Sequence, residues 1–217
     1  MSSVQIEWPG GSGSAEAQPG SAVWEVLKAA GAPSGMAGAR VDDRLRGLME
    51  PVGEAARVVA FGVNSPDGLY LLRHSTAHIM ATAIQELFPG TKFAIGPPID
   101  DGFYYDMEAP RPFTPEDLAA IEAKMREIIK ANQPFERVEV NRLMAINRFK
   151  EAGDKYKVEI LEGLPDEVVT YYINGPFTDL CRGPHVPRTG VLNSRVMGPV
   201  GHVPSAPQRA RASRNGP

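Results

Sequence analysis

The fold is decided by two short stretches of the sequence, Leu71-Leu72-Arg73-His74-Ser75-Thr76-Ala77-His78 and Cys181-Arg182-Gly183-Pro184-His185. Together they contain three of the four histidines and the only cysteine. The i, i+4 spacing of His74 and His78 places both imidazoles on one face of a helix. Gly183-Pro184 interrupts any helix in the second stretch and turns the chain. We therefore expect a helix face opposed by a rigid turn, an arrangement that suits an active site.

Length and composition limit the classes of protein that fit. The chain has 217 residues, 42% of them hydrophobic, so we expect a soluble protein with two domains. Residues 1–188 carry 19 Lys and Arg against 26 Asp and Glu, a net charge of −7 that does not suit nucleic-acid binding by charge alone. One cysteine excludes an intramolecular disulfide. No apolar run approaches the roughly 20 residues of a membrane span, and no secretion signal is seen, so we expect a cytoplasmic chain without a membrane partner.

Residues 1–62 have the pattern of a small α+β unit. Val4, Ile6 and Trp8 alternate with polar residues, which predicts a strand that ends at residues 9–11. Ser21 has the character of an N-cap for a short helix that ends at Gly31 and turns Val23, Trp24 and Leu27 inward. Three further strands are expected at 39–41, 45–48 and 58–61.

The segment 64–68 is a natural linker, and a long helix is expected from Ser65 or Asp67 to Phe88. Its apolar residues recur at helical spacing and predict one buried stripe: Leu69, Leu72, Ile79, Met80, Ala83, Ile84 and Leu87. His74 and His78 fall on nearly the opposite side. The pattern therefore indicates that the two histidines do not belong to the packed core.

The rest of the chain alternates helices and strands. Thr114-Pro115-Glu116-Asp117 predicts the start of a second helix that buries residues 118, 121, 125, 128 and 129. A half-buried strand is expected at 135–140, a third helix from Asn141 to Phe149 or Lys150, and further strands at 157–161 and 168–173. Beyond Thr189 the periodicity fades into an Arg- and Pro-rich tail that we expect to be unpacked.

The imidazole and thiol groups suggest a metal as one interpretation. His74-x-x-x-His78 alone is a weak signal, but Cys181-x-x-x-His185 adds ligands of the kind that tetrahedral Zn²⁺ prefers. The alternative is that Cys181 is a small buried hydrophobic residue and that His185 caps a turn.

Four motifs, in this order, resemble the N-terminal region of bacterial threonyl-tRNA synthetases. They are Arg73 to His78, Ala94 to Asp106, Tyr156-Lys157-Val158, and Asp179 to Pro187. The resemblance covers about residues 3–190. It implies an α+β chain with a ubiquitin-like β-grasp (TGS) domain at 1–62, followed at 63–190 by the editing domain shared with alanyl-tRNA synthetases.

The resemblance implies proofreading, and physical chemistry explains the need for it. Serine is threonine without one methyl group, so a pocket for threonine rejects serine by only about 1–3 kcal/mol. A second site that hydrolyses Ser-tRNA(Thr) solves this problem. Six residues match the family's editing site: His74, His78, Lys157, Asp179, Cys181 and His185.

The roles that we expect for these six residues follow the chemistry of ester hydrolysis. We expect His74 to position or deprotonate the attacking water, and Lys157 to neutralise the oxyanion or the leaving ribose oxygen. His78, Cys181 and His185 are expected to shape the pocket and hold the seryl group. Asp179 is expected to fix the orientation or the protonation of a neighbour.

The stretch Gly96 to Asp106 has two interpretations. Its aromatic residues can line the pocket and stack on the terminal adenosine of tRNA, with Tyr105 favoured over Tyr104 as the substrate-binding residue. Alternatively, the stretch is a turn into a buried strand and both tyrosines pack in the core.

The resemblance does not decide whether the site binds a metal. Alanyl-type relatives bind zinc through the equivalent of His74, His78, Cys181 and His185, whereas threonyl-type sites are described as working through water and side chains. We expect editing to require no cofactor, with zinc as an alternative. ATP and a catalytic zinc are expected only in the full-length family.

After Pro187 the sequence departs from the family. Relatives continue into a class II catalytic domain, so we do not expect this chain alone to aminoacylate tRNA. The atypical tail at 191–217 is either an altered reading frame or a basic arm for RNA. The expected partner is the acceptor end of tRNA(Thr), and the full-length family forms homodimers. Two alternatives are a zinc-dependent free-standing deacylase of the alanyl type and a non-catalytic RNA-binding fragment.

Overall fold

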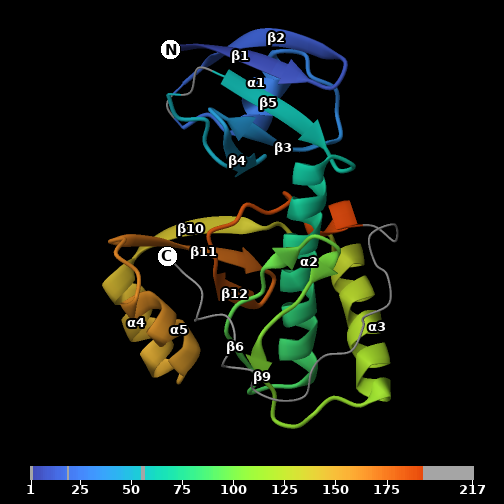
Figure 1. The fold of residues 1–217 in the computed structure, drawn as a ribbon, viewed down its shortest axis with the longest axis vertical. Coiled ribbons are helices and arrows are strands. Elements are labelled where there is room, and N and C mark those ends of the chain that lie inside the picture. Colours follow the sequence, from blue (N-terminus) through green and yellow to red (C-terminus); the bar gives the residue numbers. More distant parts are fainter. Residues whose placement is uncertain (1, 19, 55–56, 193–217) are drawn as a thin grey trace.

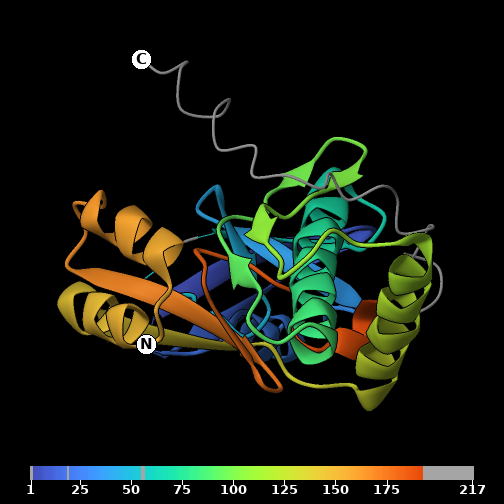
Figure 2. The ribbon, with the colours of Figure 1, turned by 90° about the horizontal axis from the view of Figure 1, so that it is seen from below.

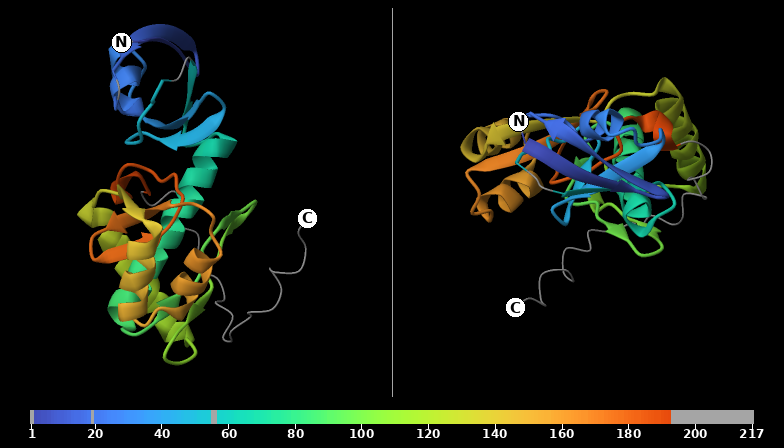
Figure 3. Two further views of the ribbon diagram at one scale, coloured as in Figure 1. Left: turned by 90° about the vertical axis from the view of Figure 1, so that its left-hand side faces the viewer. Right: turned by 90° about the horizontal axis from the view of Figure 1, so that it is seen from above.

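The computed structural model describes residues 2–18, 20–54 and 57–192. Within these ranges the fold is mixed, with five α-helices and several small sheets. An N-terminal sheet with its own helix forms one part, and the remaining elements form a second part below it (Figure 1). The helix α2 (Pro66–Leu87) leaves the first part and runs into the second, as the side view in Figure 3 shows most clearly.

The first part is a five-stranded sheet in the order β2-β1-β5-β3-β4. Its elements are β1 (Ser2–Trp8), β2 (Gly11–Ala17), α1 (Val23–Ala29), β3 (Met36–Val41), β4 (Arg44–Gly47) and β5 (Arg57–Gly62). The central pair β1 and β5 is parallel, and the other pairs are antiparallel. The alternation of Val4 and Ile6 places both side chains in a core shared with Val23, Val26 and Leu27 of α1.

Strand β2 is not predicted from its sequence, which is rich in glycine and serine. The glycines are explained by Trp8, whose indole lies across the neighbouring strand. A Cβ atom at Gly11 would meet Trp8 Nε1 at 2.6 Å, and one at Gly13 would meet the same ring at 3.2 Å. The small residues therefore leave room for the indole, which covers this end of the β1–β2 pair.

Two details of α1 differ from the prediction. Its N-cap is Ala22, because the Ser21 hydroxyl accepts a hydrogen bond from Gln18 N and does not cap the helix. Trp24 is 40% exposed and is not turned inward; Val26 supplies the buried position instead. The helix α1 has only 7 residues, which is too few for apolar spacing to specify the side on which Trp24 lies.

The long helix α2 begins as predicted, with Ser65 Oγ accepting a hydrogen bond from Gly68 N. The single apolar stripe is wrong. Leu69 is 39% exposed and Leu87 is 36% exposed, whereas His74 and His78 are buried. Seen from below (Figure 2), α2 lies between α3 (Pro115–Ala131) and the hairpin of β11 (Val168–Asn174) and β12 (Phe177–Leu180), so its middle turns are enclosed on several sides. An enclosed helix buries residues all round, and its polar residues then need partners inside the protein.

The predicted start of α3 is confirmed. Thr114 Oγ accepts from Asp117 N, and an Asp117 carboxylate oxygen accepts from Thr114 N, which forms a capping box. Ile121, Met125 and Ile128 are buried on the side that faces α2. Between α2 and α3 lie two short antiparallel pairs, β6 (Lys92–Phe93) with β9 (Met107–Glu108), and β7 (Pro98–Ile99) with β8 (Gly102–Phe103).

A three-stranded antiparallel sheet in the order β10-β11-β12 completes the second part. Its strands are β10 (Glu136–Asn141), β11 (Val168–Asn174) and β12 (Phe177–Leu180). Between β10 and β11 the chain forms α4 (Arg142–Glu151), capped by Asn141 as predicted, and α5 (Lys155–Glu162).

The strand predicted at 157–161 is wrong, because these residues belong to α5. The Asp154 carboxylate accepts from Lys157 N and caps the helix, and the helix places Leu161 in a core with Phe149 of α4. Val158, Ile160 and Leu161 fit a short strand as well as a helix, so the cap decides between them.

The packed part of the chain continues beyond residue 190. The 3₁₀ helix Thr189–Leu192 (η1) buries Leu192 completely, and Thr189 Oγ donates to the carbonyl oxygen of Ile128 at 2.9 Å. Core packing therefore reaches Leu192, two residues into the tail predicted at 191–217. The rest of that tail, residues 193–217, lies outside the described residues. None of the helices in the described ranges has the length and apolar character to span a bilayer.

Candidate functional site

Helix α2 and the turn after β12 bring four metal-ligating side chains together. His74 and His78 come from α2, and Cys181 and His185 come from the turn. One ligand atom from each lies within 4.8 Å of all the others. The four groups that the sequence places in two distant stretches therefore form one cluster.

Hydrogen bonds outside the cluster orient two of the imidazoles. His74 Nδ1 lies 3.2 Å from the carbonyl oxygen of Pro184, which can only accept, so Nδ1 carries the proton and Nε2 carries the lone pair. His185 Nδ1 lies 3.1 Å from Ser75 Oγ, and the same hydroxyl accepts from Val186 N. Both imidazoles then turn Nε2 toward Cys181 Sγ, each at 3.3 Å.

Burial controls the charge of the cluster. It lowers the pKa of His78 to about 3 and lowers the pKa values of His74 and His185 as well. Burial raises the pKa of the Cys181 thiol to about 12, with the nearby Asp179 carboxylate adding to the effect. At neutral pH the site therefore consists of three neutral imidazoles and one neutral thiol.

A buried ion pair borders the imidazoles. Lys157 Nζ of α5 pairs with Asp179 of β12 and donates to the carbonyl oxygen of Ala94 at 2.8 Å. The Asp179 carboxylate also accepts from the Tyr105 hydroxyl and lies 3.5 Å from His78 Nε2. Burial alone would raise the pKa of Asp179, but the charge of Lys157 and the hydrogen bonds outweigh it and lower the pKa. Asp179 is thus an anion held at the edge of the cluster.

The negative charge of Asp179 also favours one tautomer of His78. A proton on Nε2 faces the carboxylate, which leaves the lone pair on Nδ1. Among the described residues no hydrogen-bond partner reaches His78 Nδ1, although this atom is buried. An orphaned lone pair of this kind is available to a water, a substrate group or a metal.

The two tyrosines predicted for the substrate pocket lie in different environments. Tyr105 is buried, and its ring lies so close to Gly96 that no side chain fits there. Tyr104 is 41% exposed and contributes no group to the cluster. Sequence reasoning did not single out Ser75, which orients His185, although its position between the two histidines of α2 was available as a signal.

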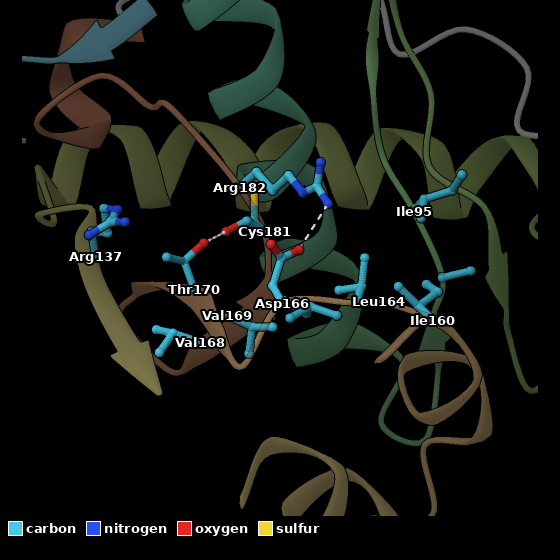
Figure 4. A pocket seen from close by; sticks show the side chains of 12 residues that line it. Ile95, Arg137, Ile160, Leu164, Asp166, Val168, Val169, Thr170, Cys181 and Arg182 are labelled. Atoms are coloured by element: carbon cyan, nitrogen blue, oxygen red, sulfur yellow. Dashed lines mark hydrogen bonds and ion pairs between the residues drawn. The ribbon is translucent and has the colours of Figure 1, made fainter. Parts of the chain in front are cut away.

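A pocket of about 430 Å³ opens beside the cluster. Figure 4 shows Ile95, Ile160 and Leu164 on one side of it, and Arg137 and Thr170 on the other. Cys181 belongs both to the pocket wall and to the cluster. Ala94, which also lines the pocket, accepts the hydrogen bond from Lys157. The pocket has the size of a small-ligand site and touches the buried groups at two points.

The four ligands fit zinc in type, and two of the distances between them fit it in spacing. Tetrahedral zinc with bonds of about 2.0–2.3 Å separates its ligand atoms by about 3.3–3.8 Å. The two distances from Cys181 Sγ to the histidine Nε2 atoms, both 3.3 Å, match this separation. The contacts of His74 Nδ1 with the Pro184 carbonyl oxygen and of His185 Nδ1 with the Ser75 hydroxyl resemble the outer contacts that orient metal-bound histidines. The same distances also suit hydrogen bonds with the thiol.

Comparison with known proteins links part of this site to a domain family. Residues 168–194 match the family described as "Threonyl and Alanyl tRNA synthetase second additional domain". The matched segment contains β11, β12 and the turn with Cys181 and His185.

Whole-sequence comparison finds threonine–tRNA ligases. The chain is 53% identical over 131 residues to the one from Oleidesulfovibrio alaskensis, covering 60% of this chain and 20% of the relative. It is 42% identical over 197 residues to that of Citrifermentans bemidjiense, covering 89% and 31%. It is 46% identical over 194 residues to that of Acidithiobacillus ferrooxidans, covering 87% and 30%. The chain thus spans about a fifth to a third of the length of these curated relatives.

Proposed function

From this homology to threonine–tRNA ligases, we propose that the chain is the N-terminal part of such a ligase and hydrolyses mischarged Ser-tRNA(Thr). The observation that carries the proposal is the cluster of His74, His78, Cys181 and His185 against a pocket of substrate size. Its partner is then the acceptor end of tRNA(Thr). The resemblance noted in the sequence is confirmed by the matched domain and by relatives that are 42–56% identical.

We assign residues 1–62 to a TGS-type β-grasp domain and residues 63–190 to the editing domain. The support is the strand order β2-β1-β5-β3-β4 with a parallel central pair and α1 packed on the sheet. The second assignment rests on the matched segment 168–194, whose described residues share one core with α2 and α3.

His74 is the proposed base. Its pKa is lowered by burial, so the imidazole is neutral near pH 7. Because Pro184 holds the proton of Nδ1, the lone pair on Nε2 is the one that can accept a proton from water. A seryl ester in the pocket would meet this edge of the cluster beside Cys181.

Lys157 is the proposed source of positive charge for the oxyanion. Its ammonium group is buried against Asp179 and donates to Ala94 O on the pocket wall. An oxyanion that develops near this wall is stabilised by a cation that water screens little. Asp179 keeps the ammonium in place, and Tyr105 holds Asp179. We assign Tyr105 to this support and leave Tyr104 as a stacking surface for the terminal adenosine.

A zinc-dependent deacylase is the second candidate, because the four side chains match a tetrahedral ligand set. The residues that would hold the ion are His74, His78, Cys181 and His185. A bound zinc would lower the pKa of a water and supply hydroxide. In this case His74 would be a ligand, and Lys157 and Asp179 would keep their supporting roles.

The proposal is tested with the purified chain and Ser-tRNA(Thr) at pH 7.5, with and without a chelator. We expect hydrolysis that survives the chelator, and a loss of about 10²–10⁴-fold in His74→Ala, because a general base is removed. Lys157→Met should also lose activity. Its matched control is Lys150→Met, since Lys150 is an exposed lysine that pairs with Glu162 at 3.1 Å.

Each other outcome selects a different function. Loss of hydrolysis with the chelator, and its return with added zinc, would favour the zinc-dependent deacylase. If the chain binds tRNA with a steep dependence on salt but does not hydrolyse Ser-tRNA(Thr), the proposal of an editing enzyme is refuted and an RNA-binding fragment is favoured.

A further inference from the structure

The N-terminal part packs directly against the turn that carries Cys181 and His185. A Cβ atom at Gly47 of β4 would lie 2.8 Å from the carbonyl oxygen of His185 and 3.6 Å from Pro184 Cβ. The backbone of β4 and the backbone of the turn therefore touch, with no side chain between them. The first part of the molecule forms a wall behind the cluster.

One buried carboxylate joins this wall to the second part. Glu50 is 5% exposed. One of its oxygens accepts from Gly47 N at 3.0 Å and from the Tyr172 hydroxyl at 3.2 Å, and the other accepts from Arg46 Nη1 at 3.2 Å. Tyr172 belongs to β11, so this hydrogen bond crosses from the N-terminal part to the strand that pairs with β12.

Tyr172 is itself placed against the turn. The centroid of its ring lies 4.5 Å from the centroid of the His185 ring, in an edge-on arrangement. Its hydroxyl lies over Gly183, which has a φ of 71° and so close a contact that no Cβ atom fits. Burial, and next the charge of Glu50, raise the pKa of Tyr172, so the phenol keeps the proton that it donates. The contacts run from Glu50 to Tyr172 and from Tyr172 to both Gly183 and His185.

We infer that Glu50 is a positioning residue: through Tyr172 it fixes the Cys181–His185 turn against α2 and so keeps the cluster assembled. Glu50 touches neither His74 nor Cys181 in the hydrogen-bond network, and its effect passes through the phenol ring. The N-terminal part thereby contributes a side chain that the second part requires for its site. The consequence for hydrolysis rests on the proposed function, but the assembly of the cluster does not.

The single cysteine makes this inference measurable without tRNA. Cys181 is the only cysteine of the chain, so the rate at which a thiol reagent such as 5,5′-dithiobis(2-nitrobenzoate) reacts reports on the turn alone. Its sulfur is held by Gly183 N at 3.2 Å and by two imidazoles. A loosened turn exposes the thiol and increases the rate.

Two variants of Glu50 separate position from charge. Glu50→Ala removes the acceptor for Tyr172 and Gly47, whereas Glu50→Gln keeps an acceptor oxygen of similar reach. Both remove the negative charge, so any electrostatic change in the thiol is common to them. We expect Glu50→Ala to react at least about tenfold faster than Glu50→Gln, and Tyr172→Phe to be faster than wild type. Circular dichroism first verifies that each variant is folded.

The control is Asp67→Asn, because Asp67 of α2 also crosses between the two parts. Both of its carboxylate oxygens accept from Arg40 at 2.7 Å, yet it does not touch Tyr172 or the turn. We expect its thiol rate to stay within about twofold of wild type. Equal rates for Glu50→Ala and Glu50→Gln would overturn the inference, as would an Asp67→Asn rate as high as that of Glu50→Ala.

Deacylation by the same variants then tests whether the Glu50–Tyr172 contact matters for function. If Glu50→Ala lowers kcat for Ser-tRNA(Thr) and Glu50→Gln restores most of it, the turn is held for catalysis. If the Cys181 thiol of Glu50→Ala reacts faster but the chain never hydrolyses Ser-tRNA(Thr), the positioning role of Glu50 is supported and the proposed function is refuted. The two hypotheses therefore fail independently.

Discussion

Replacement of Asp179 by asparagine should be strongly destabilising, because it leaves the Lys157 ammonium without a buried counterion. Each of the two side chains is only 4% exposed. Removal of one partner from a buried ion pair costs about 3–5 kcal/mol, since the remaining charge has lost its compensation away from water. A domain is stable by only about 5–15 kcal/mol, so this is a large fraction of the total.

The change is measured by urea unfolding at pH 7.5 and by thermal melting. For a chain of this length, about 3–5 kcal/mol corresponds to a fall in Tm of roughly 6–20 °C. The control is Glu122→Gln, which breaks an ion pair between the exposed Arg126 and Glu122, whose side chains are 51% and 30% exposed. An exposed pair contributes about 0–1 kcal/mol, so this variant should unfold close to wild type.

A double variant sharpens the test. Lys157→Met in the Asp179→Asn background leaves no buried charge and should recover a substantial part of the lost stability. An Asp179→Asn cost as small as that of Glu122→Gln would refute the reasoning. So would a double variant whose loss is simply the sum of the two single losses.

Three other perturbations test the remaining parts of the account. With metal removed, the free energy of unfolding should be at its full value above about pH 6.5 and should fall as the pH drops toward the pKa values of the folded state, about 3 for His78. Burial lowers the pKa values of His74, His78 and His185, so below about pH 6.5 the unfolded chain binds protons that these folded imidazoles do not. Each histidine contributes up to about 1.4 kcal/mol per pH unit, and urea unfolding between pH 7.5 and 5.5 measures this dependence on pH. Saturating zinc at about 100 times its Kd should stabilise the chain by about 2.7 kcal/mol if the cluster binds it, and Cys181→Ser should abolish that gain in a thermal melt. Gly183→Ala should cost more than about 1 kcal/mol in urea, because the φ of 71° and the overlying Tyr172 both exclude a methyl group, while no loss would show that the turn is free to move.

Elements with explicit start signals were predictable from the sequence. Thr114 and Asn141 cap α3 and α4 as their positions indicate, because side-chain acceptors at these sites satisfy the first backbone amides of each helix. The fate of 157–161 was not predictable from apolar spacing, and Asp154 was the overlooked cap. Strand β2 gave no apolar signal, because its glycines make room for Trp8.

Part of the candidate site was likewise predictable from the sequence, and part was not. The histidines of α2 and the 181–185 turn carry their chemistry in their residue types, so their concentration was visible in the sequence. Their burial was not, because spacing alone treated α2 as a surface helix although it is enclosed by α3 and the β11–β12 hairpin. Glu50 and Tyr172 lie 122 residues apart, and no local pattern links them. Long-range polar contacts of this kind emerge only from the folded structure.

The central claim is that the pocket beside Cys181 discriminates a seryl from a threonyl ester while the neighbouring groups hydrolyse it. The most direct test is the ratio of hydrolysis rates for Ser-tRNA(Thr) and Thr-tRNA(Thr) under identical conditions. Exclusion of one methyl group should give a ratio of about 10–200 in favour of the seryl ester, and His74→Ala should remove the fast hydrolysis. Equal rates for the two esters, or a seryl rate that His74→Ala leaves unchanged, would contradict the account.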